Sequence, residues 1–317
     1  MRYLSIMDPL PKKEVRWDTT YAILRELAER GHEIWGTDTD CVWLSRLEFF
    51  AESYAIYPVS ETKFHLGSPR CKRLRDFDAI LIRKEPPFDM NYLYLTYLLE
   101  QITAQVSVTN HPRGIRNANE KLITLQFPKW IPDTLVTSSA EKICEFQDKI
   151  QDALVVKPLN LKQGQGVVLL KKNARPRLSL CRKWTQQGRR TVMAQRFLKT
   201  KKAQGDKRIL VLNGEVLTAF ERHCPARDFR ANLTLGATFH PTHITPKERQ
   251  MIAEMKDYLV KQGLHFVGLD VMMEKLIEIN VTCPAGISVA QVLYSDSAPV
   301  RKWADFLEGL GSRKSRS

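Results

Sequence analysis

Apolar and polar positions along the first third of the chain predict strands and helices in alternation. Short apolar runs predict strands at 3–7, 32–37, 78–83 and 106–109. Amphipathic runs predict helices at 19–30, which Asp18 can cap, and at 91–103. The order of strands and helices predicts a parallel sheet, with an irregular, strand-like stretch at 41–75.

Ligands gather at the carboxyl ends of the strands in open sheets of this kind. Arg83 ends one predicted strand, and Asp89 follows it in a proline-stiffened loop. Together with Asp18 at the first helix, these two residues are candidates for contact with a substrate.

A polar stretch at 111–117 predicts a domain boundary, which divides the chain into 1–117, 118–307 and a short basic tail, 308–317. Helices are predicted at 119–127 and 138–150. Antiparallel strands then follow at 153–157, 167–171, 191–197, 208–212 and 215–220. Asn213-Gly214 suits the type I′ turn of a hairpin. A helix from Thr245 to about Gly263 precedes a last hairpin, 266–272 with 276–281.

The last hairpin carries the sharpest chemical pattern. Glu278 and Asn280 are two residues apart, so they project from the same face of a strand, and Asp270 can face them from the neighbouring strand. Three oxygen-bearing side chains in one patch suit Mg²⁺. The polar, solvent-facing side of an ordinary hairpin would show the same pattern. Apolar neighbours are expected on the opposite face, at positions 267, 269, 271, 277, 279 and 281.

A lysine and a glycine-containing loop form a second pattern. Lys157 ends a predicted strand, and the loop 160–166 contains Gly164 and Gly166. Backbone N–H groups and an ammonium can hold phosphates in this way, although a plain hairpin turn has the same composition. A third stretch, from Gln195 to Leu198, could clasp a flat base through its backbone and Phe197, or simply pack in the core.

Composition narrows the class of protein. The chain has 317 residues and a net charge of +14. Residues 160–235 contain 18 Lys and Arg against 4 Asp and Glu, so this stretch accounts for the whole surplus. Such a stretch suits an anionic partner, either a nucleotide with an acidic substrate or a nucleic acid.

No apolar run approaches the ~20 residues of a membrane span, and the start does not resemble a signal peptide, which predicts a cytoplasmic protein. The six cysteines show no CxxC pair, and no zinc site or disulfide framework is expected.

Taken together, these patterns resemble the bacterial glutathione synthetase family of ATP-grasp ligases. The matching blocks are 83–89, 119–122, 132–137, 156–159, 193–195, 205–208, 230–233, 266–270 and 278–282. The resemblance implies an α/β protein with an ATP-grasp fold behind a Rossmann-like, parallel-sheet N-terminal domain. It also implies an ATP-dependent ligase that forms an amide through an acyl phosphate, with Mg²⁺, or Mn²⁺ in its place, as the metal.

The resemblance also implies roles for matched residues. Lys121 and Lys157 would hold ATP phosphates, with Gly164 and Gly166 in the loop above them. Gln195, Phe197 and Leu198 would line the adenine slot, and Asp206 would lie near the ribose. Asp270, Glu278 and Asn280 would bind the metal ions. Arg208 would lie near the reacting phosphates, and Arg230 and Asn232 would border the acyl phosphate.

Three positions depart from the family pattern. The loop after Lys157 begins with Asn160 and has fewer glycines than the family's, Ser288 stands where the family has an arginine after Gly-Ile, and Glu85 stands where the family usually has Asp. The expected function is therefore glutathione synthesis from γ-glutamylcysteine and glycine, or a related ligation of another acidic peptide or amino acid to an amine.

Two other hypotheses remain. One is a non-catalytic relative that still binds nucleotide. The other is a nucleic-acid-binding protein that uses the basic stretch, although nucleic acid is the less favoured partner. The family resemblance also predicts a homo-oligomer without a membrane partner. Shielding of an acyl phosphate predicts mobile lids at 160–166 and 223–238.

Overall fold

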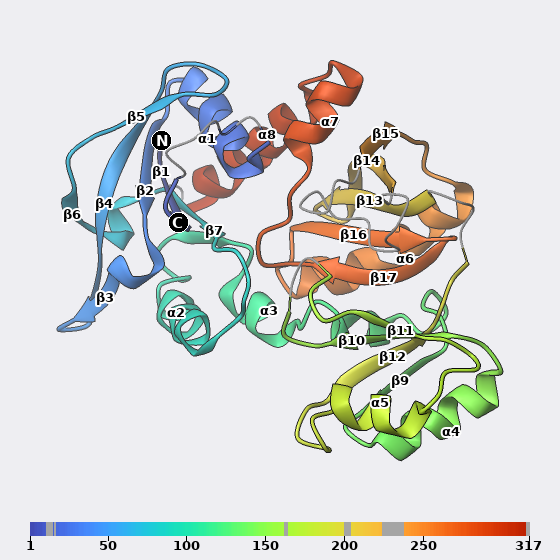
Figure 1. Cartoon of the computed structure of the whole chain (residues 1–317). Coiled ribbons are helices and arrows are strands. Elements are labelled where there is room, and N and C mark those ends of the chain that lie inside the picture. The colour runs from blue at the N-terminus through green and yellow to red at the C-terminus, as the bar shows by residue number, and fades with distance from the viewer. Residues whose placement is uncertain (11–14, 16, 162–163, 200–203, 224–237, 315–317) are drawn as a thin grey trace.

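The computed structural model describes residues 1–10, 15, 17–161, 164–199, 204–223 and 238–314. In Figure 1 an N-terminal sheet with its helices lies at one side, and two further sheets face each other at the other side. Arg230 and Asn232, with most of the predicted lid 223–238 and part of the lid 160–166, lie outside the described residues. No helix in the described ranges combines the length and the apolar character that a bilayer crossing requires.

The N-terminal sheet is parallel at its centre, as the sequence predicts. Its parallel strands run in the order β2 (Glu33–Thr37), β1 (Arg2–Met7), β7 (Ala79–Arg83), β8 (Ser107–Thr109). The stretch expected to be irregular instead extends the sheet with antiparallel strands: β3 (Val42–Ser45), β4 (Glu48–Pro58), β5 (Phe64–Leu66) and β6 (Arg70–Arg73). Short 3₁₀ turns, η1 (Thr39–Cys41) and η2 (Leu74–Asp76), join these strands.

Helices cover both faces of this sheet. α2 (Met90–Gln101) packs on one face, and α1 (Thr19–Glu29) packs on the other together with the last helix, α8 (Ala298–Lys314). The side chains of Asp18 and Asp89 cap α1 and α2, because each accepts the backbone N–H of the third residue of its helix.

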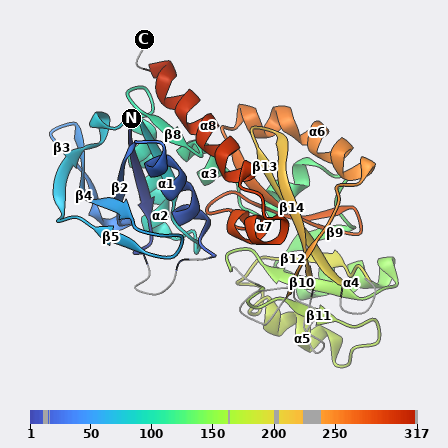
Figure 2. The same cartoon turned by 90° about the horizontal axis from the view of Figure 1, so that it is seen from above.

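The last helix of the chain belongs to the core of the first domain. Val300, Trp303, Ala304 and Leu307 are buried among residues of α1, β1 and β7. Figure 2 shows α8 running back toward the N-terminal sheet. The helix therefore crosses the expected division at 307/308 without a break and extends through the expected tail as far as Lys314, the last described residue.

The second sheet is antiparallel, with helices on its outer side. Its strands run in the order β11 (Val168–Leu170), β10 (Leu154–Pro158), β12 (Val192–Arg196), β9 (Thr134–Thr137). α4 (Ala140–Ile150) and α5 (Arg177–Trp184), of which the sequence patterns did not predict α5, cover one face. The predicted helix at 119–127 is wrong: α3 (Pro112–Asn117) ends before it, and the segment forms only the 3₁₀ turn η3 (Leu122–Gln126).

The third sheet carries the last hairpin. Its strands run in the order β15 (Thr238–Pro241), β14 (Glu215–His223), β13 (Gln204–Leu212), β16 (Phe266–Met272), β17 (Lys275–Asn280). α6 (Pro246–Lys261), which opens at the capping box of Thr245 and Glu248, packs on its apolar face. α7 (Ile287–Tyr294), which the sequence patterns did not predict, follows the hairpin.

Bulges set the register of both hairpins in this sheet. The turn Met273-Glu274 alone would place Asp270 opposite Ile277, but a register shift after Asp270 places it opposite Glu278. Leu276 then takes the buried position expected for Ile277, which is only half-buried. A similar shift between Leu210 and Val211 moves the β13–β14 pairing by one residue.

Candidate active site

The last hairpin brings the three predicted metal-binding side chains onto one face of the third sheet. Asp270 pairs with Glu278 across the strands, and Asn280 lies two pairs further along, opposite Gly268. Asn280 Nδ2 donates to Gly268 O at 3.0 Å and approaches Asp270 Oδ2 at 3.3 Å. The three side chains therefore lie together, whereas metal binding by them stays a prediction.

Two arginines hold the carboxylate of Asp270. Arg208 donates from Nε to Asp270 Oδ1 at 2.6 Å, and Arg222 Nη2 lies 3.0 Å from Asp270 Oδ2. Burial alone would raise the pKa of Asp270, but the two guanidinium groups outweigh it and lower the pKa to about 2. Asp270 is therefore ionised at neutral pH, as a metal ligand must be.

Arg222 is a site residue that the sequence patterns missed. It lies opposite Asp206 on the neighbouring strand and donates from Nε to Asp206 Oδ1 at 2.7 Å. Burial raises the pKa of Asp206; Arg222 opposes this shift, and the charge of Asp270 adds to it. Counting back from the Asn213-Gly214 turn without a bulge would have put Glu221 in this place. The bulge, which carries no clear residue signal, brings Arg222 there instead.

Lysines face these carboxylates from the other side. Lys157 is 8% exposed, and its Nζ donates to Gln195 Oε1 at 2.6 Å. Lys121 Nζ donates to Glu278 Oε1 at 3.0 Å and to Leu161 O at 2.9 Å. Burial lowers the pKa of Lys157 to about 8; Glu278 opposes the shift and Lys121 adds to it. Two lysines thus face the carboxylates of the third sheet, which Arg208 and Arg222 of that sheet also contact.

The expected nucleotide-binding segments flank this meeting point. Gly164 and Gly166 both have positive φ, 70° and 67°, and a side chain at Gly166 would meet Pro158 Cγ at 2.8 Å. Phe197 and Leu198 are half-buried directly after β12, whose Gln195 also donates from Nε2 to Thr134 Oγ1 at 3.0 Å. Their contact with a base stays a prediction.

The three expected substrate residues have structural partners. Arg83 is 4% exposed, and it donates from Nε to Thr20 Oγ1 (3.0 Å) and from Nη2 to Pro284 O (2.8 Å). Asp18 caps α1, and its backbone carbonyl accepts the hydroxyl of Ser288 at 3.1 Å. Asp89 caps α2 and is exposed. Contact of these three residues with a substrate stays a prediction.

Residues 281–288, which we call the junction segment, connect the hairpin to the first domain. Glu120, a second residue that the sequence patterns missed, holds its start: Glu120 Oε1 accepts Val281 N (2.9 Å), Thr282 N (3.1 Å) and Thr282 Oγ1 (2.8 Å). Burial and the nearby charge of Glu278 raise the pKa of Glu120, and the hydrogen bonds from Thr282 and Val281 oppose that shift. The signals for Glu120 in the sequence were its place directly before Lys121 and within the matching block 119–122.

The donor set fits a hard divalent cation that also binds substrate oxygens. Asp270 and Glu278 supply carboxylates, and Asn280 supplies an amide oxygen. Within the described ranges, no three His, Cys, Asp or Glu side chains form a metal-binding group by themselves. A divalent cation held by these three side chains would complete its coordination with further oxygen atoms, from water or a phosphate.

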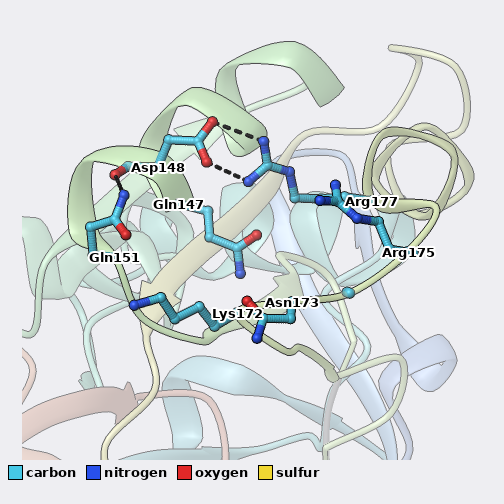
Figure 3. A pocket seen from close by; sticks show the side chains of 8 residues that line it. Gln147, Asp148, Gln151, Lys172, Asn173, Arg175 and Arg177 are labelled. Carbon is cyan, nitrogen blue, oxygen red and sulfur yellow. Dashed lines mark hydrogen bonds and ion pairs between the residues drawn. The ribbon is translucent and has the colours of Figure 1, made fainter.

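A hollow of about 230 Å³ lies away from these residues, on the outer side of the second sheet. It lies between the end of α4 and the connection from β11 to α5, and an ion pair of Asp148 with Arg177 crosses one side (Figure 3). Its lining is polar and contains none of the predicted site residues, so it is separate from the candidate site. The lining residues are Gln147, Asp148, Gln151, Lys172, Asn173, Ala174, Arg175 and Arg177.

Two known protein-family domains match this chain, one after the other along the sequence. Residues 1–116 match the N-terminal domain of prokaryotic glutathione synthetase, and residues 120–294 match its ATP-grasp domain. The chain belongs to the prokaryotic glutathione synthetase family. As a member of that family, it is an ATP-dependent carbon–nitrogen ligase, and its reaction uses ATP and a divalent metal.

The sequences of curated relatives align with this chain over at least 90% of their own length. Glutathione synthetase of Nostoc sp. is 36% identical over 90% of this chain and 92% of its own, and that of Synechococcus elongatus is 38% identical over the same shares. The enzyme of Brucella melitensis is 36% identical over 89% of this chain and 90% of its own.

Solved structures confirm the expected ATP-grasp fold. D-cycloserine synthetase DcsG superposes with a TM-score of 0.67 at 13% identity, covering 97% of this chain and 100% of its own. The ATP-grasp ligase PsnB, bound to a precursor variant, Mg and ADP, superposes with a TM-score of 0.61 at 14% identity, with 98% of each chain covered. At these identities the likeness concerns the fold alone.

Proposed function

We propose that the chain joins the carboxylate of γ-glutamylcysteine to the amine of glycine, with Mg²⁺ as the metal. The observation that supports this is the meeting of Lys121 and Lys157 with Asp270 and Glu278 between two sheets. Curated relatives named glutathione synthetase align over about nine-tenths of the chain.

The reaction proceeds through an acyl phosphate. The γ-phosphoryl group of ATP passes to a carboxylate oxygen of the dipeptide, with loss of ADP. The glycine amine then attacks the acyl carbon, phosphate leaves, and the amine loses a proton as the amide forms. Such phosphoryl transfer depends on positioning and charge neutralisation rather than on a covalent protein group.

The site residues have three roles in this reaction: phosphate binding, charge neutralisation and metal binding. Lys121 and Lys157 bind phosphate oxygens under the loop of Gly164 and Gly166, and Arg208 neutralises the transferring group. Asp270, Glu278 and Asn280 hold Mg²⁺, which supplies positive charge to the phosphates when bound. Lys121 must then exchange Glu278 for phosphate, since the two are paired here at 3.0 Å.

The adenine and ribose contacts involve the strands beside these cations. Gln195, Phe197 and Leu198 line the adenine slot at the end of β12. Asp206 meets the ribose, which requires that it exchange Arg222 for the sugar. Arg230 and Asn232 border the acyl phosphate by family resemblance. Asp18, Arg83 and Asp89 remain candidates at the dipeptide side, and Arg83 also donates to the Pro284 carbonyl of the junction segment.

A panel of substrates tests the function. Phosphate release would be measured with ATP, Mg²⁺ and pairs drawn from γ-glutamylcysteine, other dipeptides, glycine and other amines. We expect γ-glutamylcysteine with glycine to be fastest. No turnover with any pair would contradict the ligase assignment.

A specific observation favours a second candidate, ligation of a different acidic peptide or amino acid. Ser288, at the family's arginine position, donates its hydroxyl to Asp18 O and supplies no cation to the dipeptide side. A faster reaction with another pair in the same panel would support this candidate. The homo-oligomeric state and the cytoplasmic location stay predictions.

Glu278→Gln tests the metal-binding role. The substitution keeps the side-chain shape but removes the charge, so we expect the fold to persist and Mg²⁺-dependent turnover to fall about 100-fold or more. Glu274→Gln is the matched control, because Glu274 lies at the turn of the same hairpin and pairs with Lys247 away from the site. Equal activity of the two variants would contradict the role of Glu278.

A further inference from the structure

A threonine of the first domain caps a helix that follows the last hairpin. Gly286 is the N-cap residue of α7 and has no side chain that could accept the free N–H groups there. Thr19, at the start of α1, supplies the missing acceptor. Its Oγ1 accepts Gly286 N at 2.9 Å and Ile287 N at 3.2 Å, and Thr19 is only 2% exposed.

The junction segment connects this helix cap to the carboxylates of the site through hydrogen bonds. Ala285, directly before the capped glycine, offers its carbonyl to Arg208 Nη1 at 3.1 Å. Arg208 in turn donates from Nε to Asp270 Oδ1 at 2.6 Å. One continuous set of contacts therefore connects Thr19 to a guanidinium group that holds a predicted metal ligand.

The position of Gly286 leaves little room for the segment to shift. Its φ is +131°, and a Cβ atom there would meet the ring of Phe220 at 2.7 Å. Phe220 pairs with Arg208 across β13 and β14, so the ring and the guanidinium group border the same stretch of chain. The hydroxyl of Thr19 holds the other side of that stretch.

We propose that Thr19 is a positioning residue of the ligase reaction: by capping α7 from the first domain, it fixes the Ala285 carbonyl and through it the guanidinium of Arg208. This inference rests on the proposed function, in which Arg208 neutralises the transferring phosphoryl group. Thr19 acts on the transition state through Arg208, whereas Lys157 and Gln195 on the second sheet lie outside this set of contacts. Loss of the hydroxyl should therefore lower kcat and leave the KM for ATP within about twofold.

The test compares Thr19→Val, which keeps the shape without the hydroxyl, with Thr19→Ser, which restores it. Thr96→Val is the matched control, because Thr96 is buried in α2 of the same domain and its hydroxyl donates to Leu93 O of its own helix. We expect kcat to fall about tenfold in Thr19→Val, to recover in Thr19→Ser, and to stay within about twofold of wild type in Thr96→Val.

Amide hydrogen exchange supplies a readout independent of turnover. Peptides that cover 284–290 should exchange about tenfold faster in Thr19→Val than in Thr96→Val, since two N–H groups lose their acceptor. Unchanged exchange would overturn the cap, and faster exchange with unchanged kcat would overturn the coupling to Arg208. A wild-type protein without turnover on the substrate panel would instead contradict the proposed function, and exchange would still decide whether Thr19 holds the segment.

Discussion

Acidic and basic side chains that are largely buried meet in the candidate site, and their hydrogen-bond partners differ in kind. Asp270 has two arginines, Glu278 has Lys121, and Lys157 has the neutral amide of Gln195. A buried ammonium held by an amide oxygen recovers only part of the hydration that it loses. Among these side chains, Lys157 is therefore the one whose charged form a bound anion would stabilise most.

The pKa of Lys157 makes nucleotide binding depend on pH. Burial lowers the pKa to about 8 in the free protein, so the ammonium is charged below pH 8 and increasingly neutral above it. A bound triphosphate favours the charged form and raises that pKa again. ATP affinity should therefore be constant below about pH 8 and fall by up to about tenfold per pH unit above it. Calorimetric titration at pH 7, 8 and 9 measures this.

Two variants separate Lys157 from other groups that titrate nearby. Lys157→Met should bind ATP more weakly at pH 7 and lose the fall above pH 8. Lys157→Arg keeps its charge throughout and should lose only the fall. An unaltered pH profile in Lys157→Met would show that another group causes the dependence.

Single residues of the site could be predicted where an alternating pattern places them. Asp270, Glu278 and Asn280 stand out because acidic and amide side chains interrupt apolar strands at fixed spacing. Arg222 and Glu120 could not be found in this way. The partner of Arg222 depends on a backbone bulge, and the role of Glu120 depends on a segment that begins 161 residues further along the chain.

The β16–β17 hairpin shows how one element is fastened to the rest. Its returning strand is held at the end by Glu120, whose carbonyl also accepts Ile279 N at 2.9 Å. The carboxylate closes three further hydrogen bonds to residues 281 and 282. Glu278 and Asn280 lie on this strand, so their placement depends on that fastening.

Substitution of Glu120 tests the fastening. Glu120→Ala removes the acceptor of three hydrogen bonds, so the free energy of unfolding should fall by about 3 kcal/mol, at roughly 1 kcal/mol for each bond. Glu120→Gln keeps an acceptor oxygen and removes a buried charge, so it should cost less. Urea denaturation at neutral pH measures both differences.

The sign of the pH dependence follows from the raised pKa of Glu120. The folded protein holds this proton more tightly than the unfolded chain, so wild type loses stability as pH rises above the ordinary glutamate range. Glu120→Gln has no such group, and its stability relative to wild type should increase from acid to neutral pH. A constant difference across that range would contradict burial of the charge.

Whole elements followed from the sequence where periodicity and caps agreed. Asp18 and Thr245 marked the starts of α1 and α6 correctly, and Asn213-Gly214, with positive φ at both residues, marked the hairpin turn. α5 buries Cys181 alone among its eight residues, so its sequence lacks an apolar stripe. The N-cap residue of α7 is Gly286, and the side chain that accepts its N–H group belongs to the distant Thr19, so no local signal marks this helix.

At the scale of the molecule, one core passes through both domains and α8 closes it. Trp303 stacks on Phe266 of the third sheet with ring centroids 4.1 Å apart, while α8 itself packs against α1. Arg83 lies over both rings, at 5.4 Å from that of Trp303 and 5.7 Å from that of Phe266. The arrangement of the domains therefore depends on a helix at the far end of the sequence, which local patterns do not place.

Removal of the Trp303 side chain should weaken both domains together. Trp303 is 2% exposed, and Trp303→Ala should lower the free energy of unfolding by about 3–5 kcal/mol. Arg301→Ala, at an exposed position of the same helix, is the control and should change it by less than about 0.5 kcal/mol. Denaturant titration followed by fluorescence and circular dichroism measures both. Two separate unfolding transitions with only one shifted would contradict a shared core.

The return of α8 also has a consequence for synthesis on the ribosome. The first domain begins the chain, yet the side of its sheet beneath Val300, Trp303 and Leu307 is covered only after those residues have emerged. This apolar surface of the nascent N-terminal domain therefore stays exposed while the remainder of the chain is translated. Chaperones, which bind exposed apolar surface, can bind the domain during that interval.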